Sequence, residues 1–439
     1  MIMREMKDSG ISWVGEIPKE WNKRPIRSII KSRVGGVWGD DINDDIQGVV
    51  CIRIADFDFS KRKIKDVSSD LLTYRLYNSI QIQKYSLQKN DILIEKSGGG
   101  EKTPVGRAVL FDKNYKALFA NFMDRIRIDD SIVLPVFAEY WLWNLYSCRV
   151  TPYYINQTIG IQNIDLTFML AKEKICFPSL AEQQRIADFL DRKCGKIDGL
   201  KADIQAQIDT LEQYKRSVIT EAVTHGLNPS APMKDSGIPW VGEIPAKWAV
   251  LPIYCVYGER KRKNVFGTEQ NLLSLSYGKV IRKDINTNGG LLPSNYNGYN
   301  IIEKNDIIIR PTDLQNDRTS LRTGLVKEHG IITSAYIALK PKNRVSSKFY
   351  HYLLHSYDVK KVFYNMGNGV RQGLNYGEFA KLMVYYPPLD EHQEIADYLD
   401  NKCAEIEQII ADKKSQIETL DGYKKSLIYE YVTGKKEVI

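Results

Sequence analysis

One stretch of this chain occurs twice, and it constrains the fold more than any other feature. Residues 178–224 reappear in register, without a gap, as residues 387–433. Apolar residues recur every seven positions in the first copy, and a neighbouring apolar stripe includes Leu200 and Tyr214. This spacing predicts a coiled-coil type of helix, roughly 60 Å long at a rise of about 1.5 Å per residue. Because a lone helix with one apolar seam needs a partner, we expect the two copies to pack together.

A second repeat divides the chain into two halves. Residues 6–21 and 233–248 differ at only three positions, and their Gly, Pro and Trp residues predict an ordered loop held by two indoles. Gene duplication accounts for both repeats, since each half reads as loop, variable region and long helix. The predicted domains are a first region with its loop (1–177), a long helix (178–226), a linker with the second loop and region (227–386), and a second helix (387–439).

The variable regions are expected to share a fold. Short apolar runs bounded by turn residues, such as 48–54 and 125–128, predict β-strands. Pro135 precedes an amphipathic segment that predicts a helix. The motif Lys-Asn-Asp followed by three apolar residues occurs at 89–94 and again at 304–309. The rest of the two regions has little sequence in common, so we expect one architecture with different surface loops.

Composition is that of an ordinary globular protein and argues against several functional classes. No apolar run is long enough to span a membrane, and the N-terminus lacks the apolar segment of a signal peptide, so we expect a cytoplasmic protein. The six cysteines include no Cys-x-x-Cys pair, which argues against a zinc site or a disulfide framework. A net charge of +8 favours an acidic partner such as nucleic acid.

Basic and amide side chains gather in loops that follow the matched strands. Arginine pairs with guanine, asparagine and glutamine pair with adenine, and lysine and threonine bind phosphates. The alternative interpretation is that these are solvated loop charges. The predicted DNA-contacting residues of the first half are Lys61, Arg62, Lys63, Lys96, Ser97, Lys102, Thr103, Arg107, Gln162 and Asn163. Those of the second half are Arg260, Lys261, Arg262, Arg310, Thr312, Gln315, Arg318, Arg322, Arg371 and Gln372.

The sequence contains no recognisable catalytic motif. It lacks both the Gly-x-x-x-x-Gly-Lys-Ser/Thr loop and a Gly-x-Gly-x-x-Gly fingerprint after a strand. Asp91, Glu95 and Lys96 have the residue types of a magnesium-dependent nuclease, but the second half has arginine in place of Glu95. His351 and His355 stand one helical turn apart and suit a metal ion, although packing or solvent exposure is commoner for such a pair.

Both repeated motifs resemble those of one known family. The first is Lys-Asp-Ser-Gly-Ile-x-Trp-Val-Gly-Glu-Ile-Pro at 7–18 and 234–245. The second is Pro-x-Leu-x-Glu-x-Gln-x-Ile-Ala-Asp-x-Leu-Asp at 178–191 and 387–400. From end to end, the chain resembles the DNA-specificity (S) subunit of type I restriction–modification systems.

The resemblance implies an α+β fold with two tandem target recognition domains of mixed α/β structure. Two long helices would separate them as an antiparallel coiled coil, giving an internal pseudo-two-fold repeat. Each domain would read one half of a bipartite, asymmetric site in double-stranded DNA, and the helices would set the spacer length. Two methyltransferase subunits that hold S-adenosylmethionine, and restriction subunits that use ATP and magnesium, are the implied partners. The chain itself would have no catalytic site, cofactor or metal.

Two other hypotheses predict different behaviour. A self-sufficient nuclease or methyltransferase, using Asp91, Glu95 and Lys96 or the turn at 387–388, would cleave or methylate DNA without a partner. A coiled-coil scaffold that does not read DNA would show no salt-dependent affinity, whereas phosphate contacts weaken as counterions compete.

Overall fold

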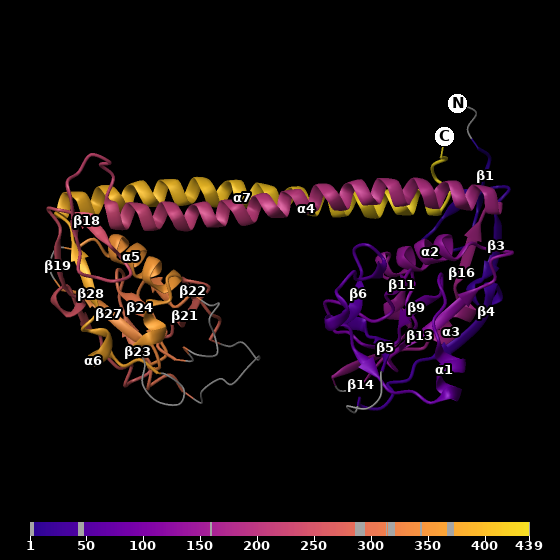
Figure 1. Ribbon diagram of the computed structural model, residues 1–439, viewed down its shortest axis with the longest axis horizontal. Helices are drawn as coiled ribbons and strands as arrows, with labels where there is room; N and C mark the ends of the chain where they lie inside the picture. The colour runs from indigo at the N-terminus through magenta and orange to yellow at the C-terminus, as the bar shows by residue number, and fades with distance from the viewer. Residues whose placement is uncertain are drawn as a thin grey trace. The chain divides into compact units, whose positions relative to one another are not determined.

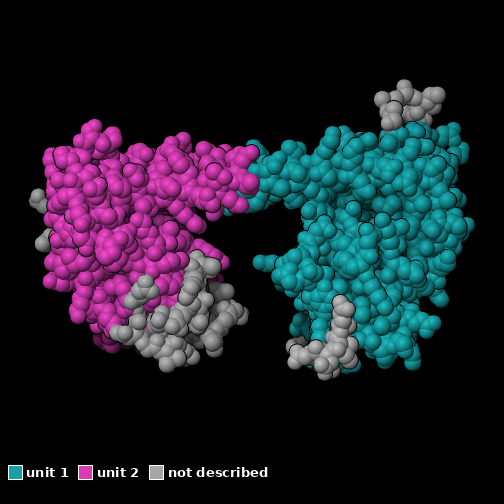
Figure 2. Space-filling view, in the orientation of Figure 1, with its two compact units in different colours: residues 1–205, 414–439 teal, residues 206–413 magenta. Residues whose placement is uncertain are grey.

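Two compact units make up the chain. The computed structural model describes residues 4–42, 48–158, 160–285, 295–312, 314, 321–342, 345–366 and 373–438. Unit 1 comprises residues 1–205 with 414–439, and unit 2 comprises residues 206–413 (Figure 2). The two long helices α4 (Leu180–His225) and α7 (Leu389–Val432) each contribute to both units (Figure 1). Of the helices in the described ranges, none combines the length and the apolar character needed to cross a bilayer.

Both predicted long helices are confirmed, and their ends have local causes. The Glu182 backbone N–H donates to Ser179 Oγ at 3.4 Å, which satisfies one of the amides left free at the start of α4. Gly226 follows α4 with φ +73°, and Gly434 follows α7 with φ +72°. Glycine adopts this left-handed conformation at little cost, so both helices stop where the sequence provides it.

Within unit 1 the two long helices run antiparallel. Phe189 of α4 packs on Tyr431 of α7 with ring centroids 4.4 Å apart. Further along α4, Asp198 accepts from Lys424 Nζ at 2.7 Å. Contacts with rising numbers on one helix and falling numbers on the other define the antiparallel direction.

The same ion pair occurs in unit 2. There Lys215 of α4 pairs with Glu407 of α7. The two pairs are related by the sequence repeat, because Lys424 minus 209 is Lys215 and Asp198 plus 209 is Glu407. The duplicated sequence therefore makes the same contact twice, with the roles of the helices exchanged.

The apolar seam is confirmed in part. Leu190 and Ile197 of the seven-residue spacing are buried, and so is Ile208 of the neighbouring stripe. Leu200 and Tyr214, which we assigned to the neighbouring stripe, remain 53% and 49% exposed. That assignment was wrong because a helix packed against one long partner buries a narrow seam rather than a broad face.

In unit 1 a six-stranded sheet forms the centre of the first variable region. The strands are, in spatial order, β4 (Ile30–Gly35), β13 (Met123–Ile128), β9 (Ile92–Glu95), β11 (Ala108–Leu110), β7 (Lys63–Ile64) and β6 (Phe57–Asp58). Neighbouring strands are antiparallel except for β11 and β7, which are parallel.

Smaller elements surround this sheet. The other sheets of unit 1 are β12 (Ala117–Phe119) with β5 (Val49–Ile52) and β8 (Tyr74–Arg75), β10 (Ser97–Gly98) with β15 (Ile161–Ile164) and β14 (Ile155–Thr158), β1 (Met6–Asp8) with β2 (Glu16–Pro18), and β3 (Asn22–Pro25) with β16 (Lys174–Phe177). The short helices are α1 (Ser79–Tyr85), α2 (Pro135–Ser147) and α3 (Leu166–Lys172). The helix predicted after Pro135 is therefore confirmed.

Unit 2 repeats the central arrangement. Its main sheet has the spatial order β20 (Tyr257–Glu259), β27 (Ile337–Pro341), β24 (Ile307–Ile309) and β25 (Thr323–Leu325). Its other strand pairs are β17 (Met233–Asp235) with β18 (Glu243–Pro245), β19 (Ala249–Pro252) with β28 (Met383–Tyr386), β21 (Leu273–Ser276) with β22 (Lys279–Arg282), and β23 (Asn300–Ile302) with β26 (Gly330–Ile332). The remaining helices are α5 (Ser347–Val359) and α6 (Tyr376–Phe379).

The order β20-β27-β24-β25 in unit 2 corresponds to β4-β13-β9-β11 in unit 1. The repeated Lys-Asn-Asp motif opens β9 and β24, with Asn90 at φ +72° and Asn305 at φ +74°. Asparagine tolerates this left-handed conformation better than most residues. The shared fold expected from the sequence is confirmed.

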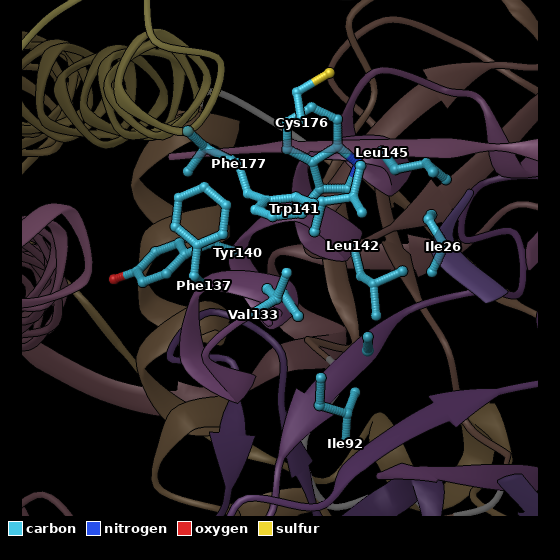
Figure 3. Close-up of a cluster of buried hydrophobic side chains, with 14 of the residues drawn as sticks. Ile26, Ile92, Val133, Phe137, Tyr140, Trp141, Leu142, Leu145, Cys176 and Phe177 are labelled. Atoms are coloured by element: carbon cyan, nitrogen blue, oxygen red, sulfur yellow. The ribbon is translucent and has the colours of Figure 1, made fainter. Parts of the chain in front are cut away.

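Indole rings hold the repeated loops against each core, as expected. Trp21 packs edge to face on Phe137 of α2, with ring centroids 6.3 Å apart, and Trp248 packs in the same way on Phe349 of α5 at 6.2 Å. Figure 3 shows Phe137 among the aromatic and aliphatic side chains that α2 buries beside Phe177. The loops therefore complete the cores that position each variable region.

Candidate nucleic-acid interface

In unit 1 two loops that are distant in sequence meet in one small sheet. Ser97 pairs with Asn163 across β10 and β15, and Gly98 pairs with Gln162. Ser97 Oγ donates to Asn163 Oδ1 at 2.5 Å, which leaves the Asn163 amide nitrogen at an exposed position. The β-sheet pairing thus brings together four of the side chains predicted to contact DNA, since Lys96 directly precedes Ser97.

Asp124 on β13 pairs with two cations next to this sheet. Lys96 Nζ lies 2.9 Å from Asp124 Oδ1, and Arg33 Nε donates to Asp124 Oδ2 at 2.7 Å. Arg33 also donates to Thr167 Oγ1 at 3.1 Å. Neither Asp124 nor Arg33 is among the residues predicted from the sequence, because the strand pairing that brings them together joins residues far apart in the chain.

A basic groove continues from Arg33 along the edge strand β4. Its volume is about 520 Å³, and its lining includes Arg27, Lys31, Arg33 and Thr167. These cations follow no motif in the sequence, because a 3₁₀ turn at 26–29 separates Arg27 from the strand. A row of cations in a groove is suited to phosphate groups.

Arg107 holds the loop in place through an ion pair and a ring contact. Its guanidinium donates to both carboxylate oxygens of Glu95, at 2.9 and 3.1 Å, and stacks over the Phe59 ring at 3.6 Å. Lys102 and Thr103 lie beyond it in an exposed turn, where Gly100 and Thr103 exchange backbone hydrogen bonds. The first half therefore presents an exposed turn on an ion-paired base.

Asp91 and Glu95 do not form the site that a nuclease needs. Asp91 accepts two hydrogen bonds from Arg127 at 2.7 and 2.8 Å, while Glu95 is paired with Arg107. The two carboxylates lie at opposite ends of β9, about 13 Å apart at about 3.3 Å per residue. They cannot share one metal ion, so their geometry supports the sheet rather than catalysis.

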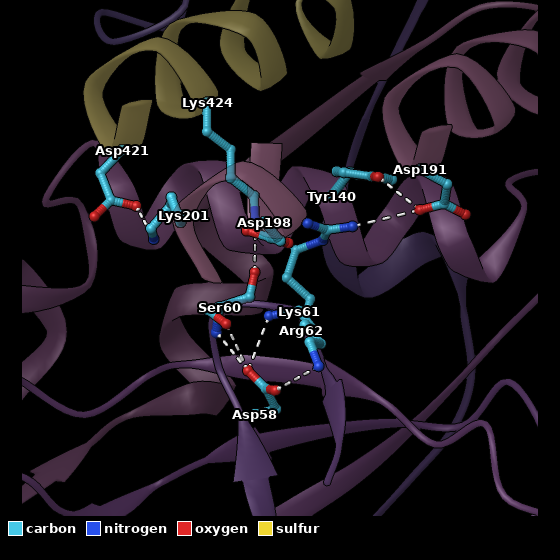
Figure 4. A network of polar contacts seen from close by, with 10 residues as sticks. All are labelled: Asp58, Ser60, Lys61, Arg62, Tyr140, Asp191, Asp198, Lys201, Asp421 and Lys424. Atoms are coloured by element: carbon cyan, nitrogen blue, oxygen red, sulfur yellow. Dashed lines mark hydrogen bonds and ion pairs between the residues drawn. The ribbon is translucent and has the colours of Figure 1, made fainter. Parts of the chain in front are cut away.

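The basic segment at 61–63 has two kinds of side chain. Lys61 and Lys63 are exposed and lie 3.7 and 3.8 Å from Asp58 and Asp112. Arg62 is buried: it stacks on Tyr140 and reaches Asp191 at 3.4 Å (Figure 4). Only the two lysines of this segment are placed to meet a phosphate.

Arg62 instead joins the variable region to α4. Its Nε donates to the buried carboxylate of Glu139 at 3.1 Å, and Tyr140 donates to Asp191 at 2.7 Å. Burial disfavours charge on Arg62, but the carboxylates of Glu139 and Asp191 outweigh it and raise the pKa of the guanidinium. In unit 2 the equivalent contact is Tyr352 to Asp400, at 2.9 Å.

The corresponding segment of unit 2 divides in the same way. Arg260 binds the buried carboxylate of Asp306, with 2.5 Å from Nε to Oδ2 and 2.9 Å from Nη2 to Oδ1. Burial raises the pKa of Asp306, and the hydrogen bond from Arg260 offsets part of that rise. Lys261 and Arg262 are exposed and pair with Glu259 and Glu303 at 2.9 and 3.5 Å.

Arg322 has an internal role in unit 2. It is fully buried, and its guanidinium donates to the carbonyls of Thr312 and Arg310 at 2.5 and 3.3 Å and to the Tyr364 hydroxyl at 3.3 Å. It therefore shapes the loop that starts at Arg310, where Thr312 is exposed. The predicted residues Gln315, Arg318, Arg371 and Gln372 lie outside the described residues.

Backbone hydrogen bonds place the two loops of unit 2 as in unit 1. Leu374 N–H donates to the Pro311 carbonyl at 3.0 Å, and Ile164 N–H donates to the Lys96 carbonyl at 2.9 Å. The loop after β9 in unit 1 thus meets the segment before α3, and the loop after β24 in unit 2 meets the segment before α6. The scaffold under the predicted contact residues is common to both units.

His351 and His355 lie on α5 with ring centroids 6.4 Å apart. Burial lowers the pKa of His351 to about 3 and that of His355 to about 4, so both are neutral at pH 7. In the part of the chain that the structure describes, no three His, Cys, Asp or Glu side chains gather as metal ligands. Both rings line a cavity together with Ile219 of α4 and Cys403 of α7.

Comparison with known proteins places this geometry in a family. Residues 18–210 and 259–419 match the type I restriction modification DNA specificity domain. The putative type I restriction enzyme MjaX specificity subunit of Methanocaldococcus jannaschii is 23% identical over 435 residues, which cover 97% of this chain and 96% of that protein. The StySPI specificity subunit of Salmonella potsdam is 22% identical over 361 residues, covering 80% of this chain and 76% of that one.

A solved structure shares the fold. It comes from a study of complex assembly and conformational transition of the type I R-M system, and it superposes with a TM-score of 0.68. The match covers 96% of this chain and 99% of that chain at 12% identity.

Proposed function

The chain belongs to the type I restriction–modification DNA-specificity family, and from this premise we propose that it reads the two halves of a bipartite DNA site. Unit 1 reads one half-site and unit 2 reads the other. The chain supplies recognition and assembly, and the catalytic groups belong to its partners. Methyltransferase subunits bring S-adenosylmethionine, and restriction subunits bring ATP and magnesium.

One observation carries this proposal: two units share a scaffold and differ in the side chains it presents. The strand order, the Trp–Phe contact beneath each loop and the Tyr–Asp contact to the long helices occur in both units. At the loops, unit 1 has Lys96 and Ser97 where unit 2 has Pro311 and Thr312. A protein that reads two unlike half-sites needs this combination of constant frame and variable contacts.

We assign base reading and phosphate binding to different residues. In unit 1, Ser97 and Asn163 are the candidates for base edges, because hydroxyl and amide groups carry the hydrogen-bonding code. Gln162 is buried, and its Oε1 accepts from the Val105 N–H at 3.3 Å. Exposed cations are candidates for phosphates. The phosphate candidates are Arg27, Lys31, Lys61, Lys63 and Lys102 in unit 1 and Lys261 and Arg262 in unit 2. Arg62, Arg107, Arg260 and Arg322 are bound internally and hold the loops in place.

The long helices offer the same surface twice, which suits two copies of one partner. Leu200 and Tyr423 are exposed in unit 1, and their repeat equivalents Ile409 and Tyr214 are exposed in unit 2. Each pair lies at one level of its helix pair, since the equivalent ion pairs Lys424–Asp198 and Lys215–Glu407 adjoin them. Large apolar side chains repeated at a protein surface are typical of interfaces. We propose that two methyltransferase subunits dock there.

A domain exchange tests the function. Residues 22–177 are replaced by the corresponding region of a relative, and the hybrid is combined with its methyltransferase on DNA, with modified adenines mapped by sequencing. One half-site is expected to change while the other half-site stays the same. A change in both half-sites, or in neither, contradicts the assignment.

Experiments on the purified chain alone test the other two hypotheses, the self-sufficient enzyme and the scaffold that does not read DNA. Purified chain without methyltransferase is expected to leave DNA uncut and unmodified, and activity of the lone chain would favour an enzyme. Its DNA affinity is expected to fall with rising salt, because phosphate contacts release counterions. An affinity that does not change with salt would favour a scaffold.

A further inference from the structure

The sequence repeat places unlike side chains at one equivalent position of the two helix pairs. In unit 1 Tyr431 packs on Phe189 with ring centroids 4.4 Å apart. The equivalents in unit 2, at an offset of 209, are Ala222 and Tyr398. Alanine has no ring to cover Tyr398, which is 42% exposed. Unit 1 therefore closes this position with its own side chain, and unit 2 leaves it open.

The open position in unit 2 is a cleft of about 750 Å³. Tyr398 of α7 forms one wall, and Val218 and Ala222 of α4 form another. Leu227 and Met233 of the linker after α4 complete the apolar lining. The cleft also includes Tyr214, so it is continuous with the exposed helix surface to which we assigned a partner.

The two units also differ in charge at this position. In unit 1 Lys436 pairs with Glu430, with Nζ 2.9 Å from Oε2. The equivalents in unit 2 are Leu227 and Glu221, and Glu221 is largely exposed beside His225. Unit 1 thus supplies an aromatic ring and a lysine from its own chain. Unit 2 supplies neither, while it keeps an aromatic wall, with Tyr398 in place of Phe189, and the glutamate Glu221.

We propose that the cleft of unit 2 receives an aromatic side chain and a neighbouring lysine or arginine from a methyltransferase subunit. This inference rests on the proposed function, in which two such subunits dock on the helices. Tyr431 and Lys436 of unit 1 show the chemistry of the occupant, because they fill the equivalent position there. The two docking surfaces are therefore unequal, and the subunit on unit 2 binds more tightly.

The size of the difference follows from what such an anchor contributes. An aromatic side chain buried in a pocket at the centre of an interface is the usual form of a binding hot spot. Its loss weakens binding by about 30-fold. The first methyltransferase copy is accordingly expected to bind about 30-fold more tightly than the second.

The test transfers the contacts of unit 1 into unit 2. The variant A222Y/L227K copies Tyr431 and Lys436, and binding of the methyltransferase chain is measured by calorimetry and native mass spectrometry. The variant is expected to lose the tight step and to bind two copies with similar, weaker affinities. Tyr398→Ala provides a second route, since this exposed residue can be truncated without disturbing the core, and it is expected to weaken the same step.

The reverse variant Y431A/K436L is the matched control, because it opens the equivalent position in unit 1. It is expected to leave the tight step unchanged. Circular dichroism and thermal unfolding check that each variant folds. Equal affinities of both steps in the wild type, or a tight step that survives both A222Y/L227K and Tyr398→Ala, would overturn the inference. A wild-type chain that binds no methyltransferase would instead contradict the proposed function.

Discussion

Replacing His392 by glutamine should protect unit 2 against acid. His392 is completely buried near the start of α7, between the rings of Phe349, Tyr350 and Tyr386. Neither ring nitrogen has a hydrogen-bond partner among the described residues. Burial lowers the pKa of this histidine to about 4, so the fold accepts only the neutral imidazole.

The equivalent residue of unit 1 shows what a well-matched side chain does at this position. Gln183 accepts from the Leu134 N–H at 2.8 Å, and its amide nitrogen donates to the carbonyls of Pro178 and Ile132 at 3.0 and 3.3 Å. Glutamine does not titrate. The substitution His392→Gln therefore removes the proton-binding group and introduces a side chain that the repeat already accommodates.

The magnitude follows from the pKa difference between the folded and unfolded states. The folded-state value is about 4 and the unfolded value about 6.5, so the contribution of the neutral ring is present above pH 6.5 and is lost as the pH falls toward 4. Between pH 7 and pH 5 the loss is on the order of 2 kcal/mol. His351, His355 and His392, the three histidines whose pKa burial lowers, all belong to unit 2, so acid should unfold that unit first.

Urea unfolding followed by hydrogen exchange and mass spectrometry measures each unit separately. The quantity compared is the change in unfolding free energy of unit 2 from pH 7 to pH 5, which should be about 2 kcal/mol smaller in His392→Gln than in the wild type. His351 and His355 are unchanged in both proteins and cancel. The reciprocal variant Gln183→His should make unit 1 acid-sensitive. Equal pH dependence of wild type and His392→Gln would refute the reasoning.

Three further predictions concern the helices and the loops. Lys424→Ala should lower the unfolding free energy by about 3 kcal/mol, because it leaves the carboxylate of Asp198 without its partner. Lys215→Ala, at the more exposed equivalent pair, should lower it by at most about 1 kcal/mol. Urea titration measures both values, and equal losses would contradict the prediction. Adding one heptad to both α4 and α7, about 10 Å, should lengthen the DNA spacer by about three base pairs, and an unchanged spacer in methylation mapping would reject the role of the helices. Asn163→Ala should reduce discrimination at one base pair of one half-site by about 10-fold. Lys261→Ala should weaken binding to all sequences alike and lower its salt dependence. The opposite pattern in binding assays would make Lys261 the base-reading residue and Asn163 the phosphate-binding one.

The sequence predicted the fold well where a repeat supplied the information. The duplicated segments placed α4 and α7 to within a few residues, and the Lys-Asn-Asp motif identified β9 and β24 as equivalent strands. Periodicity alone could not tell which apolar residues the partner helix buries. Leu200 and Tyr214 therefore remained indistinguishable from seam residues until the pairing of the helices was known.

The candidate site was predictable only in outline. Residue type marked Arg62 and Arg322 as cations suited to DNA, but their burial depends on Glu139 and on carbonyl groups brought close by the tertiary fold. Arg33 could not be predicted as a site residue, because it lies beside Lys96 only through their shared contact with Asp124. Local sequence shows which side chains are charged, whereas long-range pairing decides whether the charge faces solvent.

The contacts at the end of α7 have a consequence for synthesis of the chain. The Tyr429 hydroxyl donates to the carbonyls of Trp13 and Val14 at 3.2 and 3.1 Å, and Lys424 reaches the Ser60 carbonyl at 2.6 Å. Unit 2 is continuous in sequence, so it can fold while the ribosome is still translating. Unit 1 begins first but must wait for residues 414–439, which are made after the whole of unit 2. The N-terminal unit therefore matures after unit 2, and a ribosome that stalls within α7 leaves unit 1 without the part of that helix that it needs.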